Sequence, residues 1–209
     1  MAKVLLLNGS PRAHGCTATA LAEMIGIFER EGIETELIQV GGQTVRGCVS
    51  CGRCAGLGHC VFDDLVNEVA GKLAEADGLV IGSPVYYGSP NGALLSLLDR
   101  LFYSTRDTSK QMKVGAAVVS CRRGGNTASF DVLNKYFTLS TLPVASSTYW
   151  NQVHGFTPED VMKDAEGLQT MRNLARNMAF MIRAIADAKE KYGLPQEEHD
   201  AFTSFQDGK

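Results

Sequence analysis

With 209 residues, the chain is long enough for one domain with a sizeable hydrophobic core. Its content of 44% hydrophobic and 21% charged residues is ordinary for a globular protein in water. A net charge of −3 argues against a surface built for nucleic acid or acidic membranes. The apolar run at residues 4–7 is too short for a signal peptide or a membrane span. We therefore expect a cytoplasmic protein that binds neither nucleic acid nor membrane.

Five segments have the apolar pattern of β-strands. Residues 4–7 are continuously apolar and lead into Gly9-Ser10-Pro11, as a buried parallel strand does where it enters a loop. Two later segments repeat this pattern, one alternates in polarity, and the last is weaker. The predicted strands are residues 4–7, 35–40, 79–81, 116–119 and 144–147.

Helices are predicted between these strands. Leu21, Met24, Ile25 and Phe28 recur at helical spacing, and Gly32 follows as a stop. Further helices are predicted after an Asp63 cap, at about residues 91–102, at about 127–137, and from a Thr157 cap through Ile182. This alternation predicts an α/β fold with a parallel sheet between two helical layers.

One domain over residues 1–209 is the economical interpretation, because the sequence has no internal repeat or linker. Residues 47–62 are a cysteine-rich insertion within it. The polar tail at residues 195–209 is expected to extend over the surface or over a partner subunit.

Three loops follow the carboxyl ends of the first, third and fourth strands, where ligands bind in open parallel sheets. Residues 9–17 combine glycines, hydroxyls, an arginine and a helix N-terminus, which suits a phosphate. Residues 83–90 hold two tyrosines between prolines, which suits a planar ring. Residues 120–127 offer arginines and glycine amides for ring carbonyls or an anionic flavin. Each loop alone is also compatible with a turn that binds nothing.

Four cysteines lie within thirteen residues in the pattern C-x2-C-x2-C-x5-C, at Cys48, Cys51, Cys54 and Cys60. Four thiolates suit a four-iron cluster, and they also satisfy the tetrahedron of zinc. A third alternative is that they stay metal-free, as thiols or as a disulfide.

Together, Gly9-Ser10-Pro11-Arg12, Gly15-Cys16-Thr17, the 82–86 segment, the 120–125 segment and the cysteines followed by Asp63-Asp64 carry a family resemblance. Over residues 3–183 the chain resembles the flavodoxin-like NAD(P)H-dependent FMN reductases, and in particular their iron–sulfur flavoprotein branch. The resemblance implies a flavodoxin-like, doubly wound sheet of five parallel strands in three layers, with FMN bound non-covalently. It also implies a homodimer or homotetramer with the flavin near the interface.

The resemblance assigns FMN-binding roles residue by residue. The phosphate would be held by Ser10, Arg12, Cys16 and Thr17, the ring by Pro84, Val85, Tyr86, Tyr87 and Gly88, and the pyrimidine side by Ser120, Arg122, Arg123, Gly124 and Gly125. Cys16 stands where the family usually has asparagine, so the backbone amide is expected to serve there.

The function that the resemblance implies is an oxidoreductase in which NAD(P)H passes a hydride to flavin N5. No catalytic side chain is then needed, because the chemistry belongs to the cofactor. The electrons would continue to a small acceptor, such as a quinone, nitro or azo compound, or through a [4Fe-4S] cluster. The alternatives are a single-electron carrier of the iron–sulfur flavoprotein type and a cysteine-based redox or metal sensor.

Overall fold

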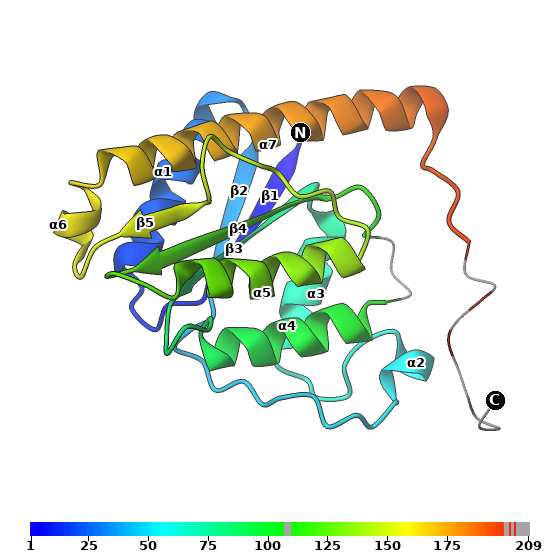
Figure 1. The fold of residues 1–209 in the computed structure, drawn as a ribbon. Coiled ribbons are helices and arrows are strands. Elements are labelled where there is room, and N and C mark those ends of the chain that lie inside the picture. The colour runs from blue at the N-terminus through cyan, green and yellow to red at the C-terminus, as the bar shows by residue number, and fades with distance from the viewer. Residues whose placement is uncertain (107–109, 199–200, 202, 204–209) are drawn as a thin grey trace.

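The computed structural model describes residues 1–106, 110–198, 201 and 203. Its sheet has five parallel strands in the order β2-β1-β3-β4-β5, which confirms the predicted fold class (Figure 1). The strands are β1 (Lys3–Asn8), β2 (Glu34–Gln39), β3 (Gly78–Pro84), β4 (Val114–Cys121) and β5 (Gln152–His154). In the register of the sheet, Leu6 of β1 pairs with Leu37 of β2 on one side and with Val80 of β3 on the other.

Helices cover both faces of the sheet. One face packs against α1 (Cys16–Arg30) and α7 (Ala165–Tyr192), and the other against α3 (Leu65–Glu75), α4 (Gly92–Ser104) and α5 (Asn126–Leu139). Consecutive strand residues serve opposite faces, so Leu6 joins the first core and Leu5 and Leu7 join the second. The central strands are therefore continuously apolar over residues 4–7, 79–81 and 116–119, as the sequence pattern indicated.

The fifth strand differs from the prediction at residues 144–147. Val144 makes only an isolated bridge to Gly115, and the ladder resumes where Gln152 is level with Val119. Between these two pairings the edge segment advances by eight residues while β4 advances by four, so the additional residues of the edge segment are not paired with β4. This excursion is fastened to α7, where the Ser147 hydroxyl donates to the Thr170 carbonyl at 2.7 Å.

The predicted last helix is two helices. The Thr157–Asp160 capping box forms as expected, but α6 (Pro158–Val161) ends after one turn. Asp164 then starts α7 by accepting the Gly167 amide at 2.9 Å, and its other oxygen accepts the His154 amide at 2.7 Å. A second cap therefore restarts the chain in a new helix. The cap of α3 is likewise Asp64, not Asp63.

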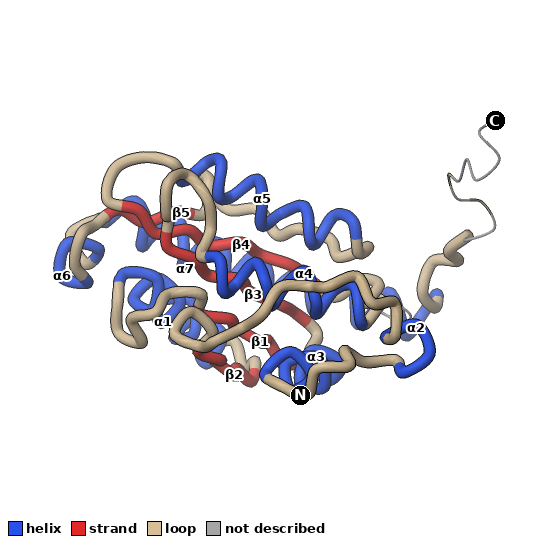
Figure 2. The backbone as a smooth tube through the Cα atoms, turned by 90° about the horizontal axis from the view of Figure 1, so that it is seen from below, coloured by secondary structure: helices blue, strands red, loops and turns tan. Residues whose placement is uncertain are grey.

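The cysteine-rich segment lies between β2 and α3 and contains the four-residue helix α2 (Cys54–Leu57). Figures 1 and 2 show it crossing α4 on the outside of the helical layer before it turns back at α2. Gly47 lies over the middle of α4, because a Cβ placed there would be 4.0 Å from the Ser96 hydroxyl. The described helices include none long and apolar enough to cross a membrane. Of the predicted tail, residues 199–200, 202 and 204–209 lie outside the described residues.

Candidate functional site

The three predicted loops meet at the carboxyl edge of the sheet. The Gly9 amide donates to the Gly82 carbonyl at 2.8 Å, which joins the loop after β1 to the end of β3. The Val85 amide donates to the Ser120 carbonyl at 3.1 Å, which joins the loop after β3 to β4. Thr17 and Ser120 share a buried hydroxyl–hydroxyl hydrogen bond of 2.7 Å. The fold therefore brings all three segments into one place.

The loop between β1 and α1 is organised by short polar contacts. The Ser10 hydroxyl accepts the Arg12 amide at 3.2 Å, and the Arg12 side chain is exposed. Thr17 is only 1% exposed, and its hydroxyl is already paired with Ser120. The Cys16 thiol donates to the Gly155 carbonyl at 3.6 Å. The groups that this loop has available for an anion are therefore the Arg12 guanidinium and the amides of the first helical turn.

Two helices at this edge begin at glycine. Among the described residues, no side chain caps α1, which starts after Gly15, or α5, which starts after Gly125. By contrast, side-chain oxygens of Asp64, Asn91 and Asp164 cap α3, α4 and α7. Helix N-termini without a side-chain cap present backbone N–H groups and a positive dipole end to an anion or a carbonyl. The four-residue helix α2 also has no side-chain cap, but among the longer described helices the two uncapped ones are those that the resemblance assigns to the flavin phosphate and the pyrimidine ring.

The loop after β3 is a tight turn that presents aromatic surface. Tyr86 and Ser89 exchange two backbone hydrogen bonds, of 2.8 and 3.0 Å, and the turn between them has positive φ angles at Tyr87 and Gly88. Tyr87 is fully exposed, and Tyr86 is 45% exposed. Pro84 is the last residue of β3. The turn thus fixes the backbone that carries the two tyrosines at this edge of the sheet.

The loop after β4 packs directly against this turn. Gly125 has φ +86°, and a Cβ added there would be 2.8 Å from both the Gly88 Cα and the Val85 Cγ1. Arg122, Arg123 and Gly124 are exposed. Cys121, at the end of β4, is buried, and this burial raises the pKa of its thiol. The two loops therefore form one continuous wall.

The four clustered cysteines line a single pocket at the other end of α4. Its wall also includes Val61, Phe62, Arg100 and Tyr103. All six cysteines of the chain are free, and Cys48 and Cys51 are exposed. Within the described residues, no three His, Cys, Asp or Glu side chains are gathered closely enough to hold a metal ion. The pocket therefore has the donor set of a thiolate metal site, in an arrangement that is not closed around a metal.

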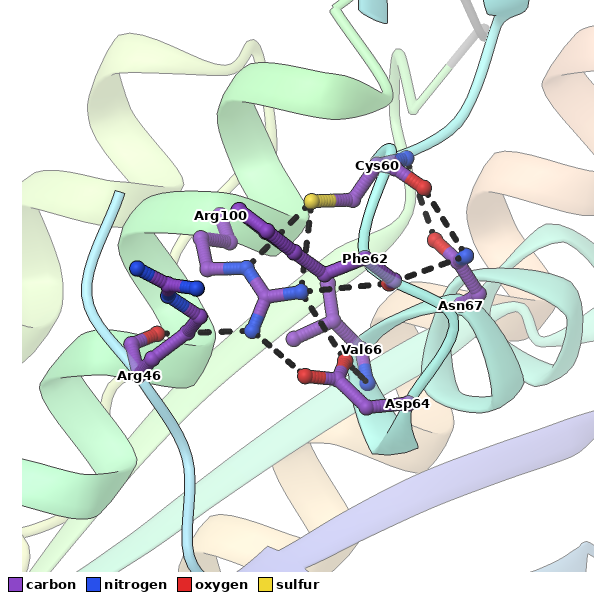
Figure 3. Close-up of polar contacts among 7 residues, drawn as sticks. All are labelled: Arg46, Cys60, Phe62, Asp64, Val66, Asn67 and Arg100. Atoms are coloured by element: carbon purple, nitrogen blue, oxygen red, sulfur yellow. Dashed lines mark hydrogen bonds and ion pairs between the residues drawn. The ribbon is translucent and has the colours of Figure 1, made fainter. Parts of the chain in front are cut away.

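Cys60 is held firmly within this pocket (Figure 3). The Arg100 guanidinium donates to its sulfur from Nη2 at 3.2 Å and from Nε at 3.3 Å. The same guanidinium makes a bidentate ion pair with the Asp64 carboxylate, from Nη1 at 2.7 Å and from Nη2 at 2.9 Å. The Asn67 amide group pins the Cys60 backbone through hydrogen bonds of 3.0 Å to both its N–H and its carbonyl. Cys60 is thus the cysteine whose place is set by helices on either side.

Comparison with known proteins identifies the family. The family model described as NADPH-dependent FMN reductase matches residues 2–155. The chain belongs to the NADPH-dependent FMN reductase family. An iron–sulfur flavoprotein of Methanocaldococcus jannaschii is 33% identical over 88% of this chain and 98% of its own length. A second iron–sulfur flavoprotein, from Methanosarcina thermophila, is 26% identical over 90% of this chain and its entire length. The chain therefore groups with the iron–sulfur flavoprotein branch.

Two further similarities extend the comparison. An FMN-dependent NADPH-azoreductase of Staphylococcus saprophyticus is 32% identical over 54% of this chain and 57% of its own length. The crystal structure of RosB with a bound riboflavin-phosphate intermediate superposes with a TM-score of 0.68 at 17% identity, over 98% of this chain and 90% of RosB. The latter similarity shows the fold alone. As a member of the FMN reductase family, the protein is a flavin-dependent oxidoreductase with FMN as its cofactor.

FMN fits the residues of this family member. The uncapped start of α1 and the exposed Arg12 suit the phosphate, while the uncapped start of α5 and the paired loops suit the ring edge. The individual contacts assigned by resemblance stay predictions. For Thr17, the bond to Ser120 leaves its backbone amide as the group available to a ligand.

Arg100, Asn67 and Asp64 were not assigned any role from the sequence as partners of the cysteines. The sequence holds one indication for Arg100. It is a charged residue on the face of α4 that also carries Leu97 and Leu101, and both leucines are fully buried. A charged residue at such a position requires a buried partner. The sequence does not indicate that Asp64 and the Cys60 sulfur supply it.

Proposed function

We propose that this oxidoreductase takes electrons from NAD(P)H and passes them to a small acceptor, such as a quinone, nitro or azo compound, through FMN and a [4Fe-4S] cluster held by Cys48, Cys51, Cys54 and Cys60. When bound, FMN supplies hydride and one-electron exchange, and a four-iron cluster supplies one-electron transfer. The observation that carries the cluster is that all four cysteines line one pocket. The relatives named iron–sulfur flavoproteins support it.

The chain's own residues prepare both ends of the proposed electron path. At the flavin end, Tyr86 and Tyr87 flank the ring position in a turn fixed by its own hydrogen bonds. At the cysteine end, Arg100 and Asn67 hold Cys60 in place. The helix α4 joins the two, because Asn91 begins it beside the tyrosine turn and Arg100 lies roughly 13 Å further along its axis.

The pocket must close for four thiolates to bind one cluster. Cys48 and Cys51 are exposed, and Gly52 and Gly58 have positive φ angles with open space where a Cβ would be. We expect this exposed segment to move toward Cys60 when a cluster binds. Cys60 would act as the fixed ligand and the other three as the arriving ones.

The first experiment is anaerobic purification followed by a visible spectrum and assays for iron, acid-labile sulfide and zinc. Flavin bands with a broad shoulder near 400 nm, about four irons and four sulfides per chain, and no zinc support the proposal. Flavin bands without iron or sulfide, after reconstitution has been attempted, would remove the cluster and leave a simple FMN reductase. Zinc in place of iron would contradict the electron-transfer role of the cysteines.

A matched pair of variants separates the cluster from the flavin. Cys51→Ser is expected to abolish iron binding while FMN stays bound. Cys51 is exposed, and its pocket lies at the end of α4 that is remote from the flavin loops. Cys121→Ala, which removes a buried thiol outside the pocket, is expected to retain both iron and FMN. Loss of FMN from Cys51→Ser, or normal iron in it, would contradict the assignment.

A single-electron carrier is the second candidate, and the cysteine pocket favours it equally. Direct oxidation of NADH or NADPH by the holoprotein separates the two functions. Turnover with a quinone or azo acceptor supports the reductase. No oxidation without an added ferredoxin-type donor supports the carrier.

We also propose a homodimer or homotetramer with the flavin near the interface, in the cytoplasm. The exposed Tyr87 and Phe156 at the carboxyl edge support the interface, and the six free thiols support a reducing compartment. Sedimentation of the FMN-loaded and FMN-free protein tests the assembly. A monomer in both forms would refute it.

A further inference from the structure

Arg100 is a buried cation beside the cysteine pocket. Its side chain is 1% exposed, so its guanidinium is shielded from bulk solvent. Four different groups surround it: the Asp64 carboxylate, the Cys60 sulfur, and the carbonyls of Arg46 and Phe62. Two of its N–H groups point at the Cys60 sulfur, which is the one predicted metal ligand that receives a charged donor within the described residues.

We propose that Arg100 is a positioning residue that sets the reduction potential of the cysteine-held cluster through its two N–H donations to the Cys60 sulfur. Asp64 is its counterpart and offsets the charge that Arg100 brings. This inference rests on the proposed cluster and deepens it. It assigns a role to two residues that are not themselves metal ligands.

The physical argument begins with the charge of the cluster. One-electron reduction adds negative charge to the cluster and to its thiolate ligands. Hydrogen-bond donors to those sulfurs stabilise the more negative state, so they raise the reduction potential. Arg100 delivers such donors from a site closed to water, where the interaction is least screened.

Asp64 acts in the opposite sense. Its carboxylate lies 2.7 Å from Arg100 Nη1 and partly cancels the positive charge seen by the cluster. Asp64 also caps α3 by accepting the Val66 amide at 3.1 Å, so its position is fixed by secondary structure. Together, Arg100 and Asp64 provide two N–H donors to the Cys60 sulfur with little net charge. The reduction potential of the cluster is therefore expected to lie between the value with Arg100 alone and the value with Asp64 alone.

A purely structural role for Arg100 is the competing explanation. Its bonds to the Arg46 and Phe62 carbonyls attach the cysteine segment to α4, and the guanidinium groups of Arg46 and Arg100 both lie over the Phe62 ring, at 4.2 and 5.3 Å from its centroid. Under this explanation, removal of either Arg100 or Asp64 loosens Cys60 in the same way. The two explanations therefore differ in the direction in which removal of the Asp64 charge shifts the reduction potential.

The test is the cluster's midpoint potential in the anaerobically reconstituted holoprotein, titrated with dithionite and mediators and followed by EPR. Arg100→Gln is expected to shift the potential to more negative values, because it removes the charged guanidinium donors and leaves the Asp64 charge without its partner. Asp64→Asn is expected to shift it to more positive values, because Arg100 stays and its charge is no longer offset. Asparagine is also a good N-cap, so α3 is preserved.

Two further variants keep the test sharp. Arg100→Lys retains the charge with fewer directed donors, so its potential is expected to lie between those of the wild type and Arg100→Gln. Arg46→Gln removes the same charge from a guanidinium that lies 4.2 Å from the Phe62 ring centroid, and it is expected to shift the potential least. FMN content and iron-to-sulfide ratio are measured for each protein, which shows that the fold and the cluster are intact.

A negative shift in Arg100→Gln together with a positive shift in Asp64→Asn supports the proposal, and the reversed pair of shifts would overturn it. Unchanged potentials, or shifts of the same sign, in variants that hold a full cluster would overturn it while the cluster itself stands. If Arg100→Gln does not retain iron, Asp64→Asn and Arg100→Lys decide the sign by themselves. Wild-type protein that takes up no iron or sulfide would overturn both the cluster and the role of Arg100, through an observation made before any potential is measured.

Discussion

Gly125 is the position where a single methyl group tests the proposed ring site most directly. The residue has φ +86°, and a Cβ there would lie 2.8 Å from both the Gly88 Cα and the Val85 Cγ1. We expect Gly125→Ala to destabilise the fold and to weaken FMN binding. Gly71→Ala on α3 is the control, because Gly71 lies outside the three flavin loops, has no heavy atom within 4 Å of an added Cβ and has no positive φ.

The magnitude has two parts. An alanine held at positive φ costs roughly 1–2 kcal/mol. Carbon atoms in contact prefer about 3.5–4.0 Å, so the loops that carry Gly88 and Gly125 must also separate by about 1 Å. In a chain of this size, 1 kcal/mol corresponds to about 2–4 °C in Tm, so we expect Tm to fall by roughly 2–8 °C. If the loop separation costs the flavin a further 1–2 kcal/mol, Kd rises about 5- to 30-fold.

The assay is titration of FMN into the deflavinated protein, followed by quenching of flavin fluorescence, with Tm from thermal unfolding of the same samples. Gly71→Ala is expected to bind FMN like the wild type and to keep or raise Tm, because alanine favours a helix over glycine. The reasoning is wrong if Gly125→Ala binds FMN as tightly as Gly71→Ala. A drop in Tm with unchanged affinity would show that this wall does not contact the flavin.

Three further predictions follow from single contacts. Asn91→Ala removes the side chain that accepts the Ala93 amide at 2.8 Å and is expected to cost about 1 kcal/mol in urea unfolding, whereas Asn91→Asp should retain the cap; equal stability of the two variants would contradict this. Burial raises the pKa of the Cys16 and Cys121 thiols, so timed alkylation of metal-free protein, mapped by mass spectrometry, should label both more slowly than exposed Cys48; equal rates would refute it. Burial opposes ionisation of Asp64, but Arg100 and the Val66 amide hold its pKa below the ordinary value, so the unfolded chain binds a proton that the folded chain does not. Its stabilisation is complete above about pH 4 and is lost as the pH falls through the lowered pKa; unfolding between pH 2 and 6 should show a weaker pH dependence in Asp64→Asn, and an unchanged profile would contradict the assignment.

Much of the fold could be predicted from local pattern. The strands at residues 4–7, 79–81 and 116–119 are apolar at every position because helices cover both faces, and such runs are unambiguous when turn residues follow them. The meeting of the three loops also followed, since parallel strands place their carboxyl ends at one edge. The capping box at Thr157 formed because it needs only its own four residues.

The predictions were wrong where residues distant in the sequence determine where a strand or helix begins or ends. The edge strand β5 is set by its register on β4 and by the attachment of residues 146 and 147 to α7, neither of which is visible in residues 144–147 themselves. The end of α6 depends on Asp164, whose carboxylate serves both the α7 amide and the His154 amide of β5.

By itself, the sequence determined the α/β class, the family and the set of groups available for FMN and for a metal, because these depend on residue types at short spacing. Only the tertiary structure decided which cysteine is held in place and by what. Arg100 comes from α4, Asn67 from α3 and Cys60 from the segment between β2 and α3, and they meet because both helices pack on the same face of the sheet. A buried cation finds its partners in space and not along the chain, so its role becomes visible only when the helices are in position.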